Sequence, residues 1–256
     1  MEIGITGLLA GFLISIVTAP VGVSGAVFLL PVQLSVLHVP NPAVTPTNLL
    51  YNVVAGPGAL LRYLRQGGFD RTLTRLLILG TLPGVIIGAF VRVFALPGPR
   101  VFRIVVAAVL LPLGLWLCLR AWRPARPRQR NIPVIPLGVG VGVIGGIYGI
   151  GGGSLLGPVL AGGGIPMATV APAALASTFV TSIAGAATFG LIALITGEGQ
   201  IAPHWALGLL CGLGGLIGGY LGARLQRHIP EAALRFLLGA LAVALAISYV
   251  SPWQIR

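Results

Sequence analysis

A glycine-rich interruption occurs twice inside long apolar stretches of this chain. Residues 147–161 read GIYGIGGGSLLGPVL, and residues 20–32 read PVGVSGAVFLLPV. The equivalent residues are 127 positions apart in each case: Gly22 and Gly149, Gly25 and Gly152, Pro31 and Pro158. Glycine and proline both disfavour a continuous helix. The pattern therefore predicts two equivalent places at which an apolar helix is broken.

The apolar stretches are long enough to cross a lipid bilayer, which takes about 20 residues as a helix. Hydrophobic residues make up 56% of the chain and charged residues only 8%. The 39 glycines and 20 prolines would weaken a soluble helical bundle, but both residue types are tolerated in membrane helices. The sequence predicts an all-α polytopic membrane protein, with the lipid bilayer as its surroundings.

The net charge of +12 comes from sixteen basic residues, all of them arginines. They lie between the apolar stretches, as the positive-inside rule requires of cytoplasmic loops, so we expect no nucleic-acid partner. Cys118 and Cys211 both lie within apolar stretches, which indicates buried thiols rather than a disulfide or a metal site. We expect no cofactor, and no cleavable signal peptide because no basic segment precedes the first apolar stretch.

The apolar stretches form eight blocks, and a polar segment divides them four and four. That segment, RAWRPARPRQRN at residues 120–131, holds five arginines. We expect a first membrane repeat at 1–119, an arginine-rich cytoplasmic linker at 120–132 and a second repeat at 133–256. PGVIIGAFVR at 83–92 matches GGLIGGYLGAR at 214–224, which favours an internal duplication. The blocks lie at 3–37, 43–61, 73–95, 101–119, 134–163, 168–196, 203–223 and 232–250.

The first block of each half is too long for one spanning helix, and the arginines distinguish two topologies. If all eight blocks cross once, the arginines divide ten against six; if the first block of each half is a hairpin, they divide twelve against four. The stronger bias favours the hairpin. Each repeat then has a broken-helix hairpin plus three transmembrane helices, and three crossings make the two repeats inverted.

The breaks are suited to binding a small anion. The N-terminal ends of broken membrane helices direct backbone N–H groups at anionic ligands in transporters, and glycine permits close approach. We expect Gly25 and Gly151–Gly153 to supply such N–H groups, with hydroxyl donors from Ser24 and Ser154. Tight helix packing is the alternative reason for the glycines.

Polar side chains open the second block of each half. TPTNLLYN, residues 45–52, contributes Thr47, Asn48 and Asn52, and ASTFVTS, residues 176–182, contributes Ser177 and Thr178. We expect them to complete the polar lining at the breaks, although hydrogen bonding between helices would also explain them. No Asp, Glu or Lys lies inside an apolar block, which argues against a cation substrate.

These motifs resemble the TauE/SafE-like sulfite exporter family. The resemblance rests on the paired breaks together with TPTNLLYNVVAGPGALLRY and GLIGGYLGARL, and it covers almost the whole chain. It implies a multi-pass protein of the inner (cytoplasmic) membrane that exports a small sulfur-containing or organic anion, such as sulfite or sulfoacetate. One departure is APAALAST, which places Ala173 and Ala174 where many relatives have a Thr-Ser pair; the polar role then passes to Ser177 and Thr178.

Two other functions remain open from the sequence. GVSG at residues 22–25 fits the pattern around the nucleophile of rhomboid proteases, which would make Ser24 catalytic, but no histidine lies mid-block to activate it. A membrane scaffold would transport nothing. We expect a transporter rather than an enzyme, and homodimerisation is left open.

Overall fold

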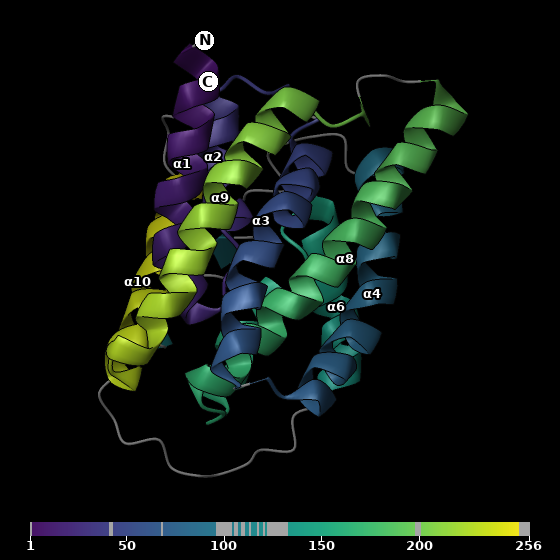
Figure 1. Cartoon of the computed structure of the whole chain (residues 1–256). Coiled ribbons are helices and arrows are strands. Elements are labelled where there is room, and N and C mark those ends of the chain that lie inside the picture. The colour runs from purple at the N-terminus through teal and green to yellow at the C-terminus, as the bar shows by residue number, and fades with distance from the viewer. Residues whose placement is uncertain are drawn as a thin grey trace.

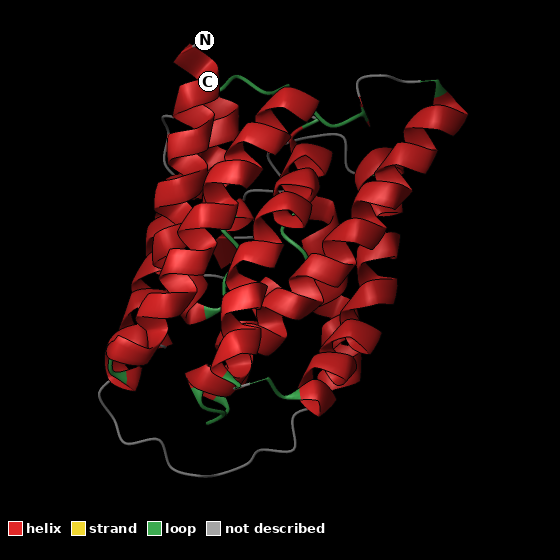
Figure 2. Cartoon of the chain, viewed as in Figure 1, coloured by secondary structure: helices red, strands yellow, loops and turns green. Residues whose placement is uncertain are grey.

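The computed structural model describes residues 2–40, 43–67, 69–95, 133–197 and 201–250, with scattered positions between 104 and 121. All regular elements in these residues are helical, which confirms the predicted all-α fold (Figure 2). The predicted linker, 120–132, lies outside the described residues except for Ala121. The elements are α1 (Glu2–Thr18), η1 (Ala19–Val21), α2 (Ala26–Ser35), α3 (Val44–Gln66), α4 (Arg71–Phe94), α6 (Val134–Tyr148), α7 (Gly153–Gly162), α8 (Met167–Thr196), α9 (Trp205–Leu225), η3 (Gln226–His228) and α10 (Glu231–Val250).

Several of these helices have the length and composition of membrane spans. Among the described residues, four segments qualify: Ile3–Val21, Arg71–Phe94, Met167–Thr196 and Trp205–His228. The helix α3 is as long as α4 but carries polar residues that the fold buries. The chain is therefore a multi-pass membrane protein, as its composition predicts.

The first break lies where the glycines predict it. The helix α1 ends at Thr18, and a short 3-10 helix with Pro20 leads to Gly22, whose φ of 72° is left-handed. A Cβ atom at Gly22 would lie 2.4 Å from the Cα atom of Ala171. Only glycine fits here, because both the backbone conformation and the contact with α8 exclude a side chain. The chain then resumes as the short helix α2.

The second break repeats this construction. The helix α6 ends at Tyr148, its C-cap Gly149 has a left-handed φ of 70°, and Gly151 has the same φ. A Cβ atom at Gly149 would lie 2.2 Å from the carbonyl oxygen of Thr45 in α3. The break is therefore pressed against α3, as the first break is pressed against α8. The prediction that the long block of each half is interrupted at its glycines is confirmed.

Glycines also bring helices of the two halves into contact. A Cβ atom at Gly11 would lie 2.0 Å from the carbonyl oxygen of Cys211, and one at Gly214 would lie 2.0 Å from that of Leu8. The helices α1 and α9 thus pack backbone to backbone. The helices α4 and α6 pack in the same way. Gly84 of α4 lies against the backbone of Val139, and Gly142 of α6 lies against the backbone of Thr81. Both pairs join a helix of the first half to one of the second.

The helices α3 and α8 lie between these two pairs and cross the middle of the bundle (Figure 1). In the same view the start of α1 lies at one end of the bundle, and the turn from α3 to α4 lies at the other. Because α3 and α8 lie in the middle of the bundle, the breaks face these two helices, which carry the buried polar side chains.

Candidate functional site

The two breaks meet each other inside the bundle. The backbone N–H of Ser24, in the first break, donates to Oγ of Ser154 at 3.0 Å, although the two residues are 130 positions apart. Ser154 lies in the first turn of α7, directly after the second break. The two glycine-rich segments therefore lie side by side in the fold.

Asn52 connects both breaks to the central helices. Its Oδ1 accepts a hydrogen bond from Oγ of Ser24, and its Nδ2 donates to Oγ of Ser182 at 3.1 Å and to the carbonyl oxygen of Gly149 at 3.4 Å. Asn52 is 3% exposed. Since buried polar groups require partners, this side chain fixes the position of each break against α3 and α8.

Thr178 of α8 adds a further hydroxyl to this network. Its Oγ1 is 3.0 Å from Oγ of Ser154, and either hydroxyl can donate. Oγ of Ser24 also accepts from the backbone N–H of Ala26, the first residue of α2, at 3.1 Å. The serines predicted as anion donors therefore already bond to protein groups in this state.

Several backbone N–H groups in the breaks, unlike these serine hydroxyls, have no described hydrogen-bond partner. Among the described residues, none accepts a hydrogen bond from the N–H groups of Gly25, Gly151 or Gly152. Free N–H groups next to a helix N-terminus attract negative charge. The predicted backbone donors are thus present without protein acceptors.

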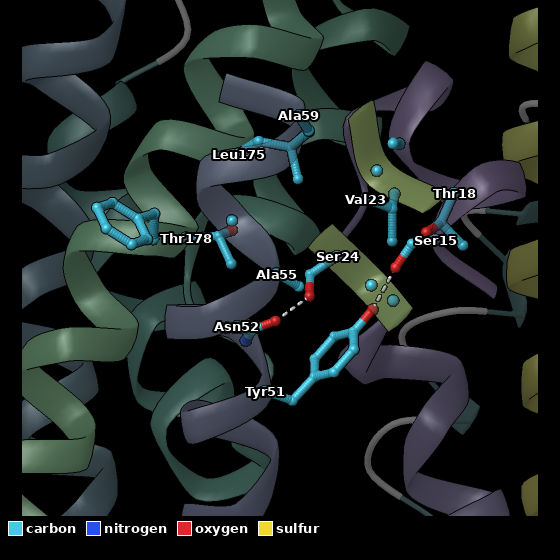
Figure 3. A pocket seen from close by; sticks show the side chains of 16 residues that line it. Ser15, Thr18, Val23, Ser24, Tyr51, Asn52, Ala55, Ala59, Leu175 and Thr178 are labelled. Atoms are coloured by element: carbon cyan, nitrogen blue, oxygen red, sulfur yellow. Dashed lines mark hydrogen bonds between the residues drawn. The ribbon is translucent and has the colours of Figure 1, made fainter. Parts of the chain in front are cut away.

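A small cavity adjoins the first break (Figure 3). Its volume of about 30 Å³ accommodates about two water molecules. No residue lining it is charged, and its polar side chains are Ser15, Thr18, Ser24, Tyr51, Asn52 and Thr178. The cavity is therefore lined by neutral hydroxyl and amide groups.

Thr18 supplies the one cavity hydroxyl that lacks a protein partner. The residue is 1% exposed, and its Oγ1 bonds to no described group. The neighbouring Oγ of Ser15, by contrast, is hydrogen bonded to the phenol of Tyr51. A buried hydroxyl without a partner is costly, so the position suits a water molecule or a ligand.

The predicted site residues fall into three groups. Ser24, Gly25, Asn52 and Thr178 line the cavity. Ser154 bonds to Thr178, and Gly151–Gly153 pack against α8 and α4 in the second break. A Cβ atom at Gly152 would lie 2.4 Å from the Cβ of Thr81, so this glycine also has a packing role.

The remaining predicted residues lie around the cavity rather than on it. Nδ2 of Asn48 donates to the carbonyl oxygen of Ala26 at 3.2 Å. Oγ of Ser177 is 2.9 Å from Oγ1 of Thr81 in α4. Thr47 lies further off: its hydroxyl donates to the carbonyl oxygen of Ala43 and accepts from the backbone N–H of His204. In this state the hydroxyl of Thr47 therefore binds the backbone of the loop before α9.

Four polar residues at or beside the site are absent from the predicted set: Ser15, Thr18, Tyr51 and Thr81. Ser15 and Thr18 are three positions apart, so they share a face of α1 just before the break. That spacing is the signal that the sequence offers for them. Tyr51 and Thr81 lie in apolar blocks, where an aromatic or a hydroxyl side chain normally packs in the core. Their spacing in the sequence does not distinguish them from such core residues.

Comparison with known proteins assigns the chain a family. The family described as sulfite exporter TauE/SafE matches residues 7–249. A probable membrane transporter protein, ORF9, from Sinorhizobium sp is 26% identical over 253 residues, which is 95% of this chain and 89% of that protein. No solved structure matches.

Proposed function

Because the chain belongs to the sulfite exporter TauE/SafE family, we propose that it carries a small anion outward across the cytoplasmic membrane. The observation that carries this proposal is the cavity at the first break, which neutral hydrogen-bonding groups line. The proposed substrates are sulfite, sulfoacetate or a similar sulfur-containing or organic anion. The site residues are those of the two breaks and of the α3 and α8 segments that face them.

The lining favours an anion over a cation. Hydroxyl and backbone N–H groups donate to an anion, and a hydrogen bond to a charged group is worth about 1.5 to 3 kcal/mol. Membrane sites for cations commonly use carboxylates, whereas each polar side chain on this cavity is a hydroxyl or an amide. The donors without an acceptor among the described residues are the hydroxyl of Thr18 and the N–H group of Gly25 at the cavity, and the N–H groups of Gly151 and Gly152 in the second break.

The volume supports a small substrate. At about 30 Å³ the cavity is roughly a tenth of an ordinary ligand pocket of about 300 Å³. An anion of four or five heavy atoms requires limited widening here, whereas a larger metabolite requires the central helices to separate.

We also propose that the two halves are inverted repeats that move relative to each other. Equivalent contacts support this arrangement: Gly22 presses on Ala171 of α8, and Gly149 presses on Thr45 of α3. The pairs α1 with α9 and α6 with α4 are likewise equivalent under exchange of the halves. Inverted repeats with binding at broken helices are a common plan of secondary transporters.

Membrane potential is sufficient to drive export. An interior-negative potential favours the exit of an anion by about 2.3 kcal/mol per charge per 100 mV. We therefore expect export without a coupled ion. The test is efflux of sulfite, sulfoacetate and acetate from vesicles that contain the purified protein, with and without an imposed potential.

We expect efflux of at least one of these anions to accelerate when the interior is negative, and empty vesicles provide the control. A protein that assembles normally but moves none of them would favour the scaffold. Labelling of Ser24 by a fluorophosphonate would favour the protease; we expect none, since the described acceptor of its hydroxyl is the amide oxygen of Asn52 rather than a base.

A further inference from the structure

Arg92 is a buried cation in the last turn of α4. It is 2% exposed, whereas a charged side chain within a membrane helix is costly and usually serves a function. Its Nε–H donates to Oγ1 of Thr45 at 3.3 Å, and the same hydroxyl donates to the carbonyl oxygen of Ile147 at 3.3 Å. The guanidinium is thus held at the end of α6, immediately before the second break.

The guanidinium of Arg92 and the cavity lie on opposite sides of the two breaks. Its anchor, Thr45, precedes Asn52 by seven residues, which is about 10 Å along α3. The α3 residues that line the cavity begin at Tyr51 and continue in the other direction to Ala59. Asn52, which bonds to both breaks, therefore separates the guanidinium from the cavity.

Asn48 lies between these two places. Thr45, Asn48 and Asn52 share one face of α3 because they are spaced by three and four residues. Asn48 is fully buried, its Nδ2 bonds to α2, and its Oδ1 bonds to no described group. An unpartnered amide oxygen here is suited to a water molecule, which can accompany an anion.

The side chains that the structure describes in the second half do not repeat this feature. Arg224 is the counterpart of Arg92 in the matching segments 83–92 and 214–224, but it is exposed. The nearby buried polar residue is Gln226, whose Nε2 donates to the carbonyl oxygen of Pro20 at 2.7 Å and to that of Met167 at 3.3 Å. The neutral amide of Gln226 thus lies at one end of the proposed anion route, and the guanidinium of Arg92 lies at the other.

We propose that Arg92 forms a second anion-binding site, on the far side of the glycine breaks from the cavity. This inference rests on the proposed anion transport and adds a charge-selective step to it. The neutral cavity receives the anion through hydrogen bonds, and the guanidinium attracts it past Asn52 and Asn48. Since attraction to a point charge scales with the charge of the ligand, Arg92 favours dianions over monoanions.

The test compares efflux of sulfite, at an alkaline pH where it is a dianion, with efflux of acetate. We expect Arg92→Gln to raise the half-saturating sulfite concentration at least tenfold and to lower the ratio of sulfite to acetate efflux. Arg92→Lys keeps the charge and should retain most of that ratio. Arg224→Gln is the matched control, because it removes an exposed arginine at the equivalent position, and it should leave the ratio unchanged.

A purely structural role for Arg92 predicts a different result. In that case Arg92→Gln would lower the melting temperature and reduce both fluxes in proportion, and an unchanged ratio in folded protein overturns the inference. If Arg92→Gln does not fold, Thr45→Val replaces it, because this variant removes the anchor of the guanidinium and should also shift the ratio. Absence of any anion efflux from the wild-type protein would instead refute the proposed transport itself.

Discussion

Gly22 fixes the shape of the first break, and we predict that its replacement by alanine destabilises the protein more than the same change at Gly67. The two residues have almost equal backbone conformations, with φ values of +72° and +74°. Alanine in this region costs about 1 to 2 kcal/mol at either position. Their surroundings differ: a Cβ atom would lie 2.4 Å from Cα of Ala171 at Gly22, but nothing lies within 4 Å of it at Gly67.

The difference between the two variants follows from that contact. The atom in contact with Gly22 belongs to the backbone of α8, so it cannot rotate aside as a side chain would. Overpacking of this kind costs about 1 to 3 kcal/mol. Gly22→Ala should therefore lose about 2 to 5 kcal/mol of folding free energy and Gly67→Ala about 1 to 2. At about 2 to 4 °C per kcal/mol, the melting temperatures should differ by roughly 2 to 12 °C.

Thermal unfolding of both purified variants in the same detergent measures this difference, and efflux from vesicles shows whether the break still functions. Gly149→Ala repeats the experiment in the second half, where the Cβ atom would lie 2.2 Å from the carbonyl oxygen of Thr45. Equal losses for Gly22→Ala and Gly67→Ala would refute the reasoning, because the packing of the break on α8 would then contribute nothing.

Three further predictions concern the cavity and the topology. Thr18→Val should weaken anion binding severalfold without lowering the melting temperature, because the hydroxyl has no partner among the described residues; a loss of stability with normal binding would contradict this. Asn52→Ala should lower the free energy of unfolding by about 2 kcal/mol, since it removes three hydrogen bonds worth about 0.6 kcal/mol each in a membrane. An unchanged melting temperature would show that these bonds do not hold the breaks in place. Single cysteines at positions 129 and 254, in a background without the native cysteines, should be labelled from the cytoplasm and from outside respectively, and labelling of both from one side would exclude the hairpin topology.

The fold followed from the sequence where the chain has little choice of conformation. Gly22 and Gly149 stand in apolar stretches with proline nearby, and both adopt the left-handed conformation that favours glycine. Polar side chains inside apolar blocks, such as Asn52 and Thr178, were expected near the breaks because a membrane offers them no other partners. The structure brings both of them to the cavity.

The rest of the site depended on how helices rotate against one another. Tyr51 and Ser15 meet because α1 and α3 both pack on α9, and no spacing in the sequence encodes that rotation. Thr47 is a predicted site residue whose contacts also depend on its place in the helix. It lies in the same polar cluster as Asn48, but its place in the first turn of α3 puts its hydroxyl within reach of His204 rather than the cavity.

The pairing of α1 with α9 also constrains how the protein is made. Leu8 and Phe12 of α1 contact Gly214 and Gly218 of α9, which the ribosome adds about 200 residues later. At about 5 to 20 residues per second, that interval is about 10 to 40 seconds. The helix α1 must therefore keep this surface covered by lipid or by the insertion machinery until α9 arrives. Synthesis that stops after the first half leaves α1 and α4 without the partners that complete them.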